Sequence, residues 1–248
     1  MMPFETLHLS ETDSTNRWLA AHGGDADIAV WTDFQTAGRG CGTNTWESER
    51  GQNLLFSLLI HPAALEATAQ FRISMAISLA MVRALEPLTG PLRIKWPNDI
   101  YWHDRKLAGI LIENQLSGRF FRQSIIGVGL NVNQTRFLSD APNPVSLCQI
   151  TGKETNREEL LSRIIGAFTL DVDPFDYRAL LYRHEGFHPY CDKEGDFEAE
   201  LETVEDDGHL VLRDRHGRLR RYAFKEVSFL LPPPTTPTPP TAPTKPTK

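Results

Sequence analysis

Apolar residues recur at two different spacings along the first two thirds of the chain, and these spacings predict a mixture of strands and helices. Residues 53–60 form an apolar run typical of a buried strand. Residues 69–88 instead repeat apolar side chains at helical spacing, with one face formed by Phe71, Met75, Leu79, Val82 and Leu85. Further strands are predicted at 4–9, 28–32, 92–95, 106–113 and 123–132. Further helices are predicted from Asp13 or Ser14 to about 21, with Trp18 and Leu19 turned inward, and at 157–170 and 174–182, capped by Asn156 and Asp173.

The pattern changes after about residue 186, where short alternating segments are separated by turn signals. Residues 198–204 alternate apolar and polar side chains, and Asp206-Asp207-Gly208 and His216-Gly217 are turn-forming sequences. The last segment, 232–248, contains eight prolines and six threonines and cannot bury a core. We therefore predict three parts: a larger domain at 1–185, a small β-domain at 186–231 and a disordered tail at 232–248.

Composition narrows the class of protein. The 248 residues carry a net charge of −6, which disfavours a nucleic-acid-binding surface. The three cysteines, Cys41, Cys148 and Cys191, show no metal-binding spacing, and reduced thiols are the simplest interpretation. No window has the length and apolar character of a membrane span, and no basic-then-apolar leader is visible at the N-terminus. A cytoplasmic location is expected.

The most informative block is Lys95-Trp96-Pro97-Asn98-Asp99, followed by an apolar strand that begins near Lys106. Pro97 ends regular strand pairing. Turns are favoured at Asn98-Asp99 and at His103-Asp104, so the chain is predicted to double back as a hairpin. Residues 106–113 are apolar on both alternating faces, as expected of a strand covered on both sides. A lysine at the rim of such a sheet is a suitable partner for a carboxylate or a phosphate.

A second block, Gln35-Thr36-Ala37-Gly38-Arg39-Gly40, lies in a long polar loop that also contains Trp46. Glycine permits close backbone approach, so the loop can surround an anion with its N–H groups. The Arg39 guanidinium can bind a phosphate or carboxylate through two hydrogen bonds.

These two blocks, together with Thr12-Asp13-Ser14-Thr15-Asn16 upstream and residues 126–133 (IGVGLNVN) downstream, resemble the biotin protein ligases over about residues 4–135. The resemblance implies an α+β fold: a class II synthetase-like, biotin/lipoyl ligase catalytic domain with a mixed sheet flanked by helices, and a small C-terminal SH3-like β-barrel. Because the similar segment begins within about a dozen residues of Met1, we expect the monofunctional type, which lacks an N-terminal DNA-binding domain.

The resemblance also implies a reaction. The carboxylate of biotin attacks the α-phosphate of ATP, with Mg²⁺, and gives biotinyl-5'-AMP with release of pyrophosphate. A lysine of a biotin carboxyl carrier protein of the acetyl-CoA carboxylase type then attacks the biotinyl carbonyl and displaces AMP. The implied catalytic residues are Lys95 and Arg39. The implied biotin-binding residues are Ser14, Thr15, Asn16, Gln35, Gly38, Arg39, Gly40, Lys95, Leu107, Gly109 and Gly127, with Ile110 as a further apolar wall. The implied nucleotide-binding residues are Arg39, Trp46, Asn98, Lys106 and Asn131, and no metal ligand is assigned.

One segment departs from the family pattern. Many members carry further basic residues after Gly-Arg-Gly, but this chain reads Cys41-Gly42-Thr43-Asn44. Two alternatives remain open: a lipoate–protein ligase or octanoyltransferase-like enzyme, whose pocket is a long apolar tunnel, and a non-catalytic binding module, which turns over no ATP. The sequence leaves open a monomer or a homodimer.

Overall fold

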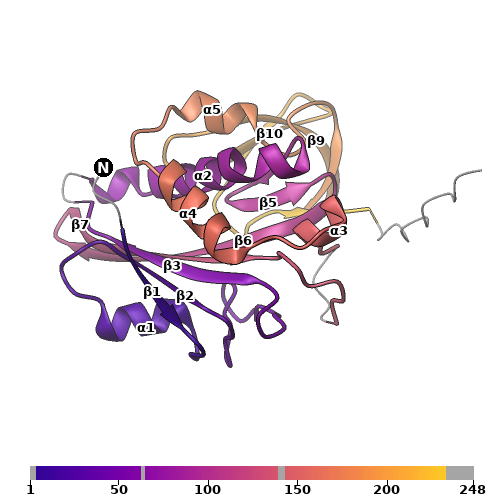
Figure 1. The fold of residues 1–248 in the computed structure, drawn as a ribbon. Coiled ribbons are helices and arrows are strands. Elements are labelled where there is room, and N and C mark those ends of the chain that lie inside the picture. Colours follow the sequence, from indigo (N-terminus) through magenta and orange to yellow (C-terminus); the bar gives the residue numbers. More distant parts are fainter. Residues whose placement is uncertain (1–3, 63–64, 139–142, 233–248) are drawn as a thin grey trace, which may run out of the picture.

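A seven-stranded mixed sheet forms the centre of the larger part of the molecule (Figure 1). The computed structural model describes residues 4–62, 65–138 and 143–232. The strand order is β1-β2-β3-β7-β6-β5-β4. Only β1 and β2 are parallel among these pairs, and the others are antiparallel. The strands are β1 (Glu5–Leu9), β2 (Ile28–Thr32), β3 (Leu54–Ile60), β4 (Arg93–Lys95), β5 (Asp99–Trp102), β6 (Arg105–Ser117) and β7 (Phe120–Leu130).

Helices cover the two faces of this sheet unequally. Figure 1 shows α1 (Thr15–His22) alone on one face, and the long helix α2 (Phe71–Thr89) with α4 (Arg157–Ala167) on the other. The short helices α3 (Leu147–Thr151) and α5 (Pro174–Ala179) and the 3-10 turn Ala67–Ala69 complete this second layer. The side chain of Asn156 caps α4 and that of Asp173 caps α5, as predicted.

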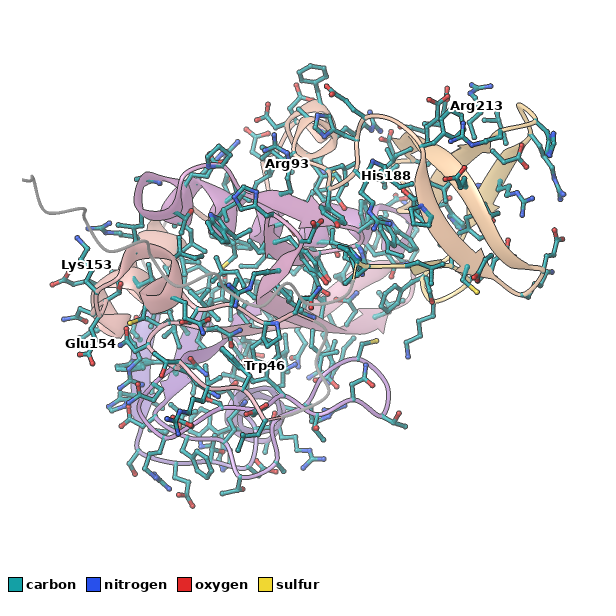
Figure 2. The ribbon with its side chains drawn as sticks, turned by 90° about the vertical axis from the view of Figure 1, so that its right-hand side faces the viewer. Trp46, Arg93, Lys153, Glu154, His188 and Arg213 are labelled. Carbon is teal, nitrogen blue, oxygen red and sulfur yellow. The ribbon has the colours of Figure 1, made fainter. Side chains whose placement is uncertain are left out.

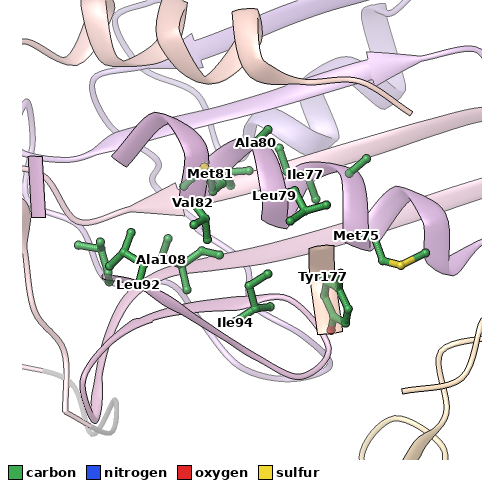
Figure 3. Packing of buried hydrophobic residues seen from close by; sticks show 14 of the residues in the cluster. Met75, Ile77, Leu79, Ala80, Met81, Val82, Leu92, Ile94, Ala108 and Tyr177 are labelled. Atoms are coloured by element: carbon green, nitrogen blue, oxygen red, sulfur yellow. The ribbon is translucent and has the colours of Figure 1, made fainter. Parts of the chain in front are cut away.

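Strand alternation divides the core into two parts. The large part lies between the sheet and α2, and Figure 3 shows Ile77, Leu79 and Val82 of α2 packed near Ile94 and Ala108 of the sheet. The small part lies under α1 and contains Leu19, Val30, Leu59 and Ile125. Successive side chains of a strand point to opposite faces, so each strand contributes to both parts. Because the part under α1 contains few apolar side chains, this face of the sheet can also hold polar groups.

A second, five-stranded antiparallel sheet follows, in the order β11-β10-β9-β8-β12. Its strands are β8 (His188–Asp192), β9 (Gly195–Val204), β10 (Leu210–Asp214), β11 (Leu219–Tyr222) and β12 (Ser228–Phe229). Figure 2 shows this sheet at one end of the molecule, where His188 and Arg213 are labelled. The indole nitrogen of Trp96 donates to the carbonyl of Gly208 at 2.9 Å, which ties the two sheets together.

The mixed α+β class, the predicted helices and all the predicted strands are confirmed, with shifts of a few residues at their ends. The C-terminal antiparallel sheet is also confirmed, whereas the boundary at 185/186 stays a prediction. The predicted tail lies outside the described residues beyond Pro232. Among the residues described, no helix is both long and apolar enough to cross a bilayer.

Four local predictions were wrong. Residues 99–102 form the strand β5, because two turns, and not one, separate β4 from β6. In β6 only Leu107 and Ala108 are fully buried; β5 pairs with β6 only as far as Ala108, so one edge of the strand is open beyond that residue. Ser14 occupies the N-cap position of α1, but its side chain makes no capping hydrogen bond. Trp18 is only half-buried, whereas Leu19 is buried as predicted.

Candidate functional site

Three glycines form the floor of the candidate site on the α1 face of the sheet. In the β6–β7 register Gly109 pairs with Gly129, and Leu111 pairs with Gly127. Paired residues of neighbouring strands share a face, so three of these four positions present backbone to whatever covers them. The covering groups come from the start of α1 and from the loop at 35–46.

A buried chain of hydrogen bonds begins at the start of α1. Gln35 Oε1 accepts from the backbone N–H of Thr15 at 2.8 Å and from its hydroxyl at 3.2 Å. The hydroxyl of Ser57, on β3, lies 2.7 Å from Thr15 Oγ1 and 2.6 Å from Asn16 Oδ1. Ser57 is fully buried, and Thr15 and Asn16 are 3% exposed. Gln35 therefore accepts a backbone N–H of the first turn of α1, the role that a capping serine would otherwise have.

The same chain continues from Asn16 to a half-exposed ion pair. Asn16 Nδ2 donates to Glu113 Oε2 at 2.8 Å and contacts the carbonyl of Leu111 at 3.4 Å. The other carboxylate oxygen of Glu113 accepts from Arg39 Nη1 at 3.0 Å. We call the whole set the polar chain; its members are Gln35, Thr15, Ser57, Asn16, Glu113 and Arg39. A cavity of 240 Å³ opens beside Asn16, Arg39 and Glu113.

Gly127 is required by this arrangement. A β-carbon at that position would lie 2.2 Å from Asn16 Oδ1 and 2.9 Å from Asn16 Cγ. Any larger residue would therefore push Asn16 out of the polar chain. The amide of Asn16 lies directly on the strand backbone, with its nitrogen and oxygen both engaged.

Trp46 fills the space above the other two glycines. A β-carbon at Gly129 would lie 2.3 Å from Trp46 Cε2, and one at Gly109 would lie 2.9 Å from Trp46 Cζ3. The two glycines thus form a slot for the indole ring. Trp46 Nε1 is buried in this slot and has no hydrogen-bond partner among the described residues, so it is available to an acceptor.

The glycine loop that carries Trp46 is a small hairpin. Arg39 bridges Thr45, and the N–H of Gly40 donates to the carbonyl of Asn44 at 2.8 Å. At its base the N–H of Trp46 donates to the carbonyl of Gly38 at 3.0 Å, and a β-carbon at Gly38 would lie 2.7 Å from Trp46 O. Gly38 therefore allows the two sides of the loop to meet, and the loop places Arg39 and Trp46 at opposite ends of the glycine floor.

The two lysines of the central block occupy different environments. Lys106 Nζ forms an ion pair with Asp99 at 2.7 Å and would lie 3.2 Å from a β-carbon at Gly109. It therefore borders the slot. Lys95 Nζ instead lies 4.8 Å from the ring centre of Phe229, on β12, and 5.8 Å from that of Tyr101.

Burial, followed by the charges of Lys106 and Arg183, lowers the pKa of Lys95 despite the opposing effect of Asp99. Lys95 has no hydrogen bond or ion pair within the described residues, so its ammonium group is a desolvated cation without a bound acceptor.

The remaining predicted residues lie further from the glycine floor or are already engaged. Leu107 is fully buried in the large core, and Ile110 packs against the same core. The wall on the α1 face is instead Leu111, which pairs with Gly127. Asn98 lies in the turn between β4 and β5. The amide nitrogen of Asn131 donates to the carbonyl of Val145 at 3.1 Å, which holds a neighbouring segment of the chain.

Two residues of the polar chain were missed from the sequence. Ser57 is the single polar residue in the otherwise apolar strand Leu54–Ile60, and a hydroxyl in a buried run needs a partner. Glu113 follows the apolar residues Gly109–Ile112 of β6. Both signals were visible as polar interruptions of apolar strands. A larger hollow of 380 Å³ lies near Arg72, Pro174 and Asp207, and none of the predicted site residues line it.

Comparisons with known proteins point to one family. Residues 11–131 match the model of the biotin/lipoate A/B protein ligase family. A biotin–[acetyl-CoA-carboxylase] ligase from Paracoccus denitrificans is 32% identical over 235 residues, which cover 85% of this chain and 95% of that protein. A solved biotin protein ligase from Aquifex aeolicus, in complex with biotin and ATP, superposes with a TM-score of 0.77 at 25% identity, covering 92% of this chain and 99% of that one.

The match and the fold therefore place the chain in the class of biotin/lipoate ligase-type proteins. More particularly, the chain belongs to the family of the biotin protein ligases. The bifunctional ligase/repressor BirA of Bacillus subtilis is 35% identical over 167 residues, which cover 64% of this chain and 50% of that protein. The chain thus matches about half the length of the bifunctional relatives.

Proposed function

We propose that this protein is an ATP-dependent biotin–protein ligase. It would activate biotin as biotinyl-5'-AMP and transfer it to a lysine of a biotin carboxyl carrier protein of the acetyl-CoA carboxylase type. The observation that carries the proposal is the polar chain, which ends in Arg39 and lies on a glycine floor bordered at its other end by Lys106. A cytoplasmic location stays a prediction.

The polar chain supports a substrate with a compact polar head group. Thr15, Asn16 and Ser57 present hydroxyl and amide groups beside the backbone of Gly127. A ureido ring offers N–H donors and a C=O acceptor to such groups, and a site built on hydrogen bonds rejects analogues that lack them. A lipoyl or octanoyl chain has no ureido group to bond to these hydroxyl and amide groups, and the long apolar tunnel expected for such a chain does not match a polar wall.

The cations support the first chemical step, in which a carboxylate approaches a polyphosphate. Lys106 borders the glycine slot and Arg39 borders the polar chain, so they flank the space where the two anions would meet. Preorganised positive charge lowers the barrier to such a step. We assign this role first to Lys106 and Arg39. Lys95 remains a proposed catalytic residue, as a further cation behind Asp99.

Water must be kept from the mixed anhydride until the carrier lysine arrives. The indole of Trp46 covers the slot over Gly109 and Gly129, and the loop that carries it is a hairpin held at Gly38. We propose that nucleotide takes the place of, or stacks on, this indole, and that Trp46 Nε1 then finds an acceptor. Movement of such loops commonly accompanies substrate binding.

Mg²⁺ would accompany ATP mainly through phosphate oxygens. The nearest site carboxylates, Asp99 and Glu113, are both paired with cations. They therefore suit contacts to the hydration shell of the ion better than direct coordination of it. Bound Mg²⁺ would neutralise phosphate charge. Lys106 and Arg39 would neutralise the rest and orient the carboxylate.

The test is ATP–pyrophosphate exchange by the purified protein with biotin, lipoate or octanoate as the acid. We expect exchange with biotin alone, followed by transfer of radiolabelled biotin to a recombinant biotin carboxyl carrier domain. Exchange with lipoate or octanoate would assign the pocket to the related ligases. Absence of exchange with every acid, while ATP still binds, would favour a non-catalytic binding module.

A further inference from the structure

The turn between β11 and β12 is held against the larger part of the molecule. Phe224, in this turn, packs edge-on against Trp96 with ring centres 6.0 Å apart. Within the turn, the N–H of Ala223 donates to the side chain of Glu226 at 2.8 Å. The C-terminal sheet thereby places residues 223–226 beside the central block of the ligase domain.

Lys225, in the same turn, reaches the tip of the glycine loop. A β-carbon at Gly42 would lie 2.5 Å from Lys225 Nζ, so the ammonium group lies directly against the loop at a position that has no side chain. Gly42 has a φ of 72°, and Lys225 also has a φ of 72°. The left-handed region is unfavourable for a residue with a β-carbon. Lys225 therefore adopts a strained conformation in the turn that presents its ammonium group to the loop.

The charges around the loop set Lys225 apart from its neighbours. Arg39 is paired with Glu113, and Lys106 is paired with Asp99. Over the described ranges, Lys225 has neither an ion pair nor a hydrogen bond, and its Nζ lies 6.0 Å from the ring centre of Phe224. The loop itself carries no basic residue between Gly40 and Trp46. An unpaired cation thus stands at the loop tip, where the loop's own sequence supplies none.

We propose that Lys225 is the second cation of the glycine loop and binds the phosphate chain of the nucleotide from the C-terminal domain. The inference rests on the proposed function, because it takes the loop as the nucleotide-binding element. It explains how a loop reading Cys41-Gly42-Thr43-Asn44 holds a polyanion with Arg39 as its only charge. It also gives the C-terminal sheet a role in substrate binding, because its turn completes the site.

The experiment compares Lys225→Gly, Lys225→Gln and Lys225→Arg with wild type in biotin-dependent ATP–pyrophosphate exchange. The glycine variant relieves the positive φ, so its folding is not at risk. We expect Lys225→Gly and Lys225→Gln to raise the KM for ATP about tenfold, as for loss of one hydrogen bond to a charged group, and to leave the KM for biotin within about twofold. Lys225→Arg keeps the charge and should stay within about threefold of wild type. Lys193→Gln, at an exposed turn of the same sheet, is the matched control.

A second variant moves the positive charge from position 225 to the loop. Cys41→Arg in the Lys225→Gly background returns a cation to the loop and should recover most of the ATP affinity. Unchanged ATP affinity in Lys225→Gly and Lys225→Gln would overturn the inference. So would an equal rise of both KM values with no rescue by arginine, because that pattern indicates a purely structural role. Calorimetric measurement of ATP binding to the same variants distinguishes failure of this inference from failure of the proposed function. Absence of exchange by the wild-type protein would refute the proposed function. Weaker ATP binding by Lys225→Gly than by wild type would still support the role of Lys225.

Discussion

Ser57 offers a sharp test of the polar chain, because the protein contains a second buried serine with the opposite hydrogen-bonding state. Ser57 and Ser78 are both fully buried. Ser57 Oγ is bonded to Thr15 and Asn16, whereas Ser78 Oγ, in α2, has no partner among the described residues. Replacing each by alanine removes the same atom from a dry environment. The two variants therefore differ in the partners that each hydroxyl leaves behind.

The magnitude follows from those partners. In Ser57→Ala, Thr15 Oγ1 keeps its contact with Gln35, but Asn16 Oδ1 loses the one partner found for it. An unsatisfied buried acceptor costs about 1–3 kcal/mol, or a fall in melting temperature of about 2–12 °C for a chain of this size. Ser78→Ala removes an unpaired hydroxyl and places a better helix former in α2, so we expect a change between zero and about 0.5 kcal/mol in favour of folding.

Thermal unfolding followed by circular dichroism measures both changes, and exchange kinetics measure the effect on the site. Ser57→Ala should raise the KM for biotin more than the KM for ATP, because Asn16 loses its fixed orientation over Gly127. Ser78→Ala should leave both KM values unchanged. Equal shifts in melting temperature for the two variants would refute the reasoning, and so would a lower stability for Ser78→Ala than for Ser57→Ala.

Three further predictions use the same assays. Lys106→Ala should lower the rate of adenylate formation by about 10²–10³-fold, the usual effect of losing one preorganised charge, and a near-normal rate in single-turnover experiments would exclude Lys106 from the first step. Gly129→Ala should displace Trp46 from the slot, because its β-carbon would lie 2.3 Å from Trp46 Cε2; a shift in tryptophan emission and an altered KM for ATP would reveal this, and unchanged emission would contradict it. Asp33 forms an ion pair with Arg157 at 2.7 Å. Burial alone would raise the pKa of Asp33, but the guanidinium of Arg157 lowers it below the ordinary value. The stability from this pair is therefore present above the ordinary carboxyl pKa and is lost as pH falls through the lowered one, so the stability difference between wild type and Asp33→Asn should shrink as the pH falls below about 5 in urea unfolding.

The elements with the strongest patterns were predictable from the sequence. β3 is fully buried and α2 repeats its apolar residues on one face, so their type follows from local pattern alone. The loop at 35–46 was also predictable, because its glycines and Arg39 lie in one uninterrupted segment. The strand β5 was not, because its four residues lie between two turn-forming sequences that hide a short strand.

The roles of the two lysines depend on information that no local pattern contains. The β5–β6 register shifts between Ile100 and Tyr101, and this irregularity decides which side chains of the hairpin reach the glycine floor. One residue of register reverses the face of a strand. Lys106 thus borders the slot, while Lys95 packs on Phe229 from the other sheet. The contact of Lys225 with Gly42 joins two distant segments, and only the packed structure brings them together.

The ion pairs of the site suit a protein that must exchange one anion for another. The Arg39–Glu113 pair has side chains 35% and 39% exposed, and such partly solvated pairs contribute about 0.2–1 kcal/mol. On the proposed function, a phosphate or carboxylate bound beside the loop would meet the same guanidinium in a drier environment, where charge-assisted hydrogen bonds are stronger. Transfer of Arg39 from Glu113 to this ligand would therefore cost little and gain more. Because Glu113 is also bonded to Asn16, we expect nucleotide binding at the loop to be coupled through this one carboxylate to the arrangement of the polar chain.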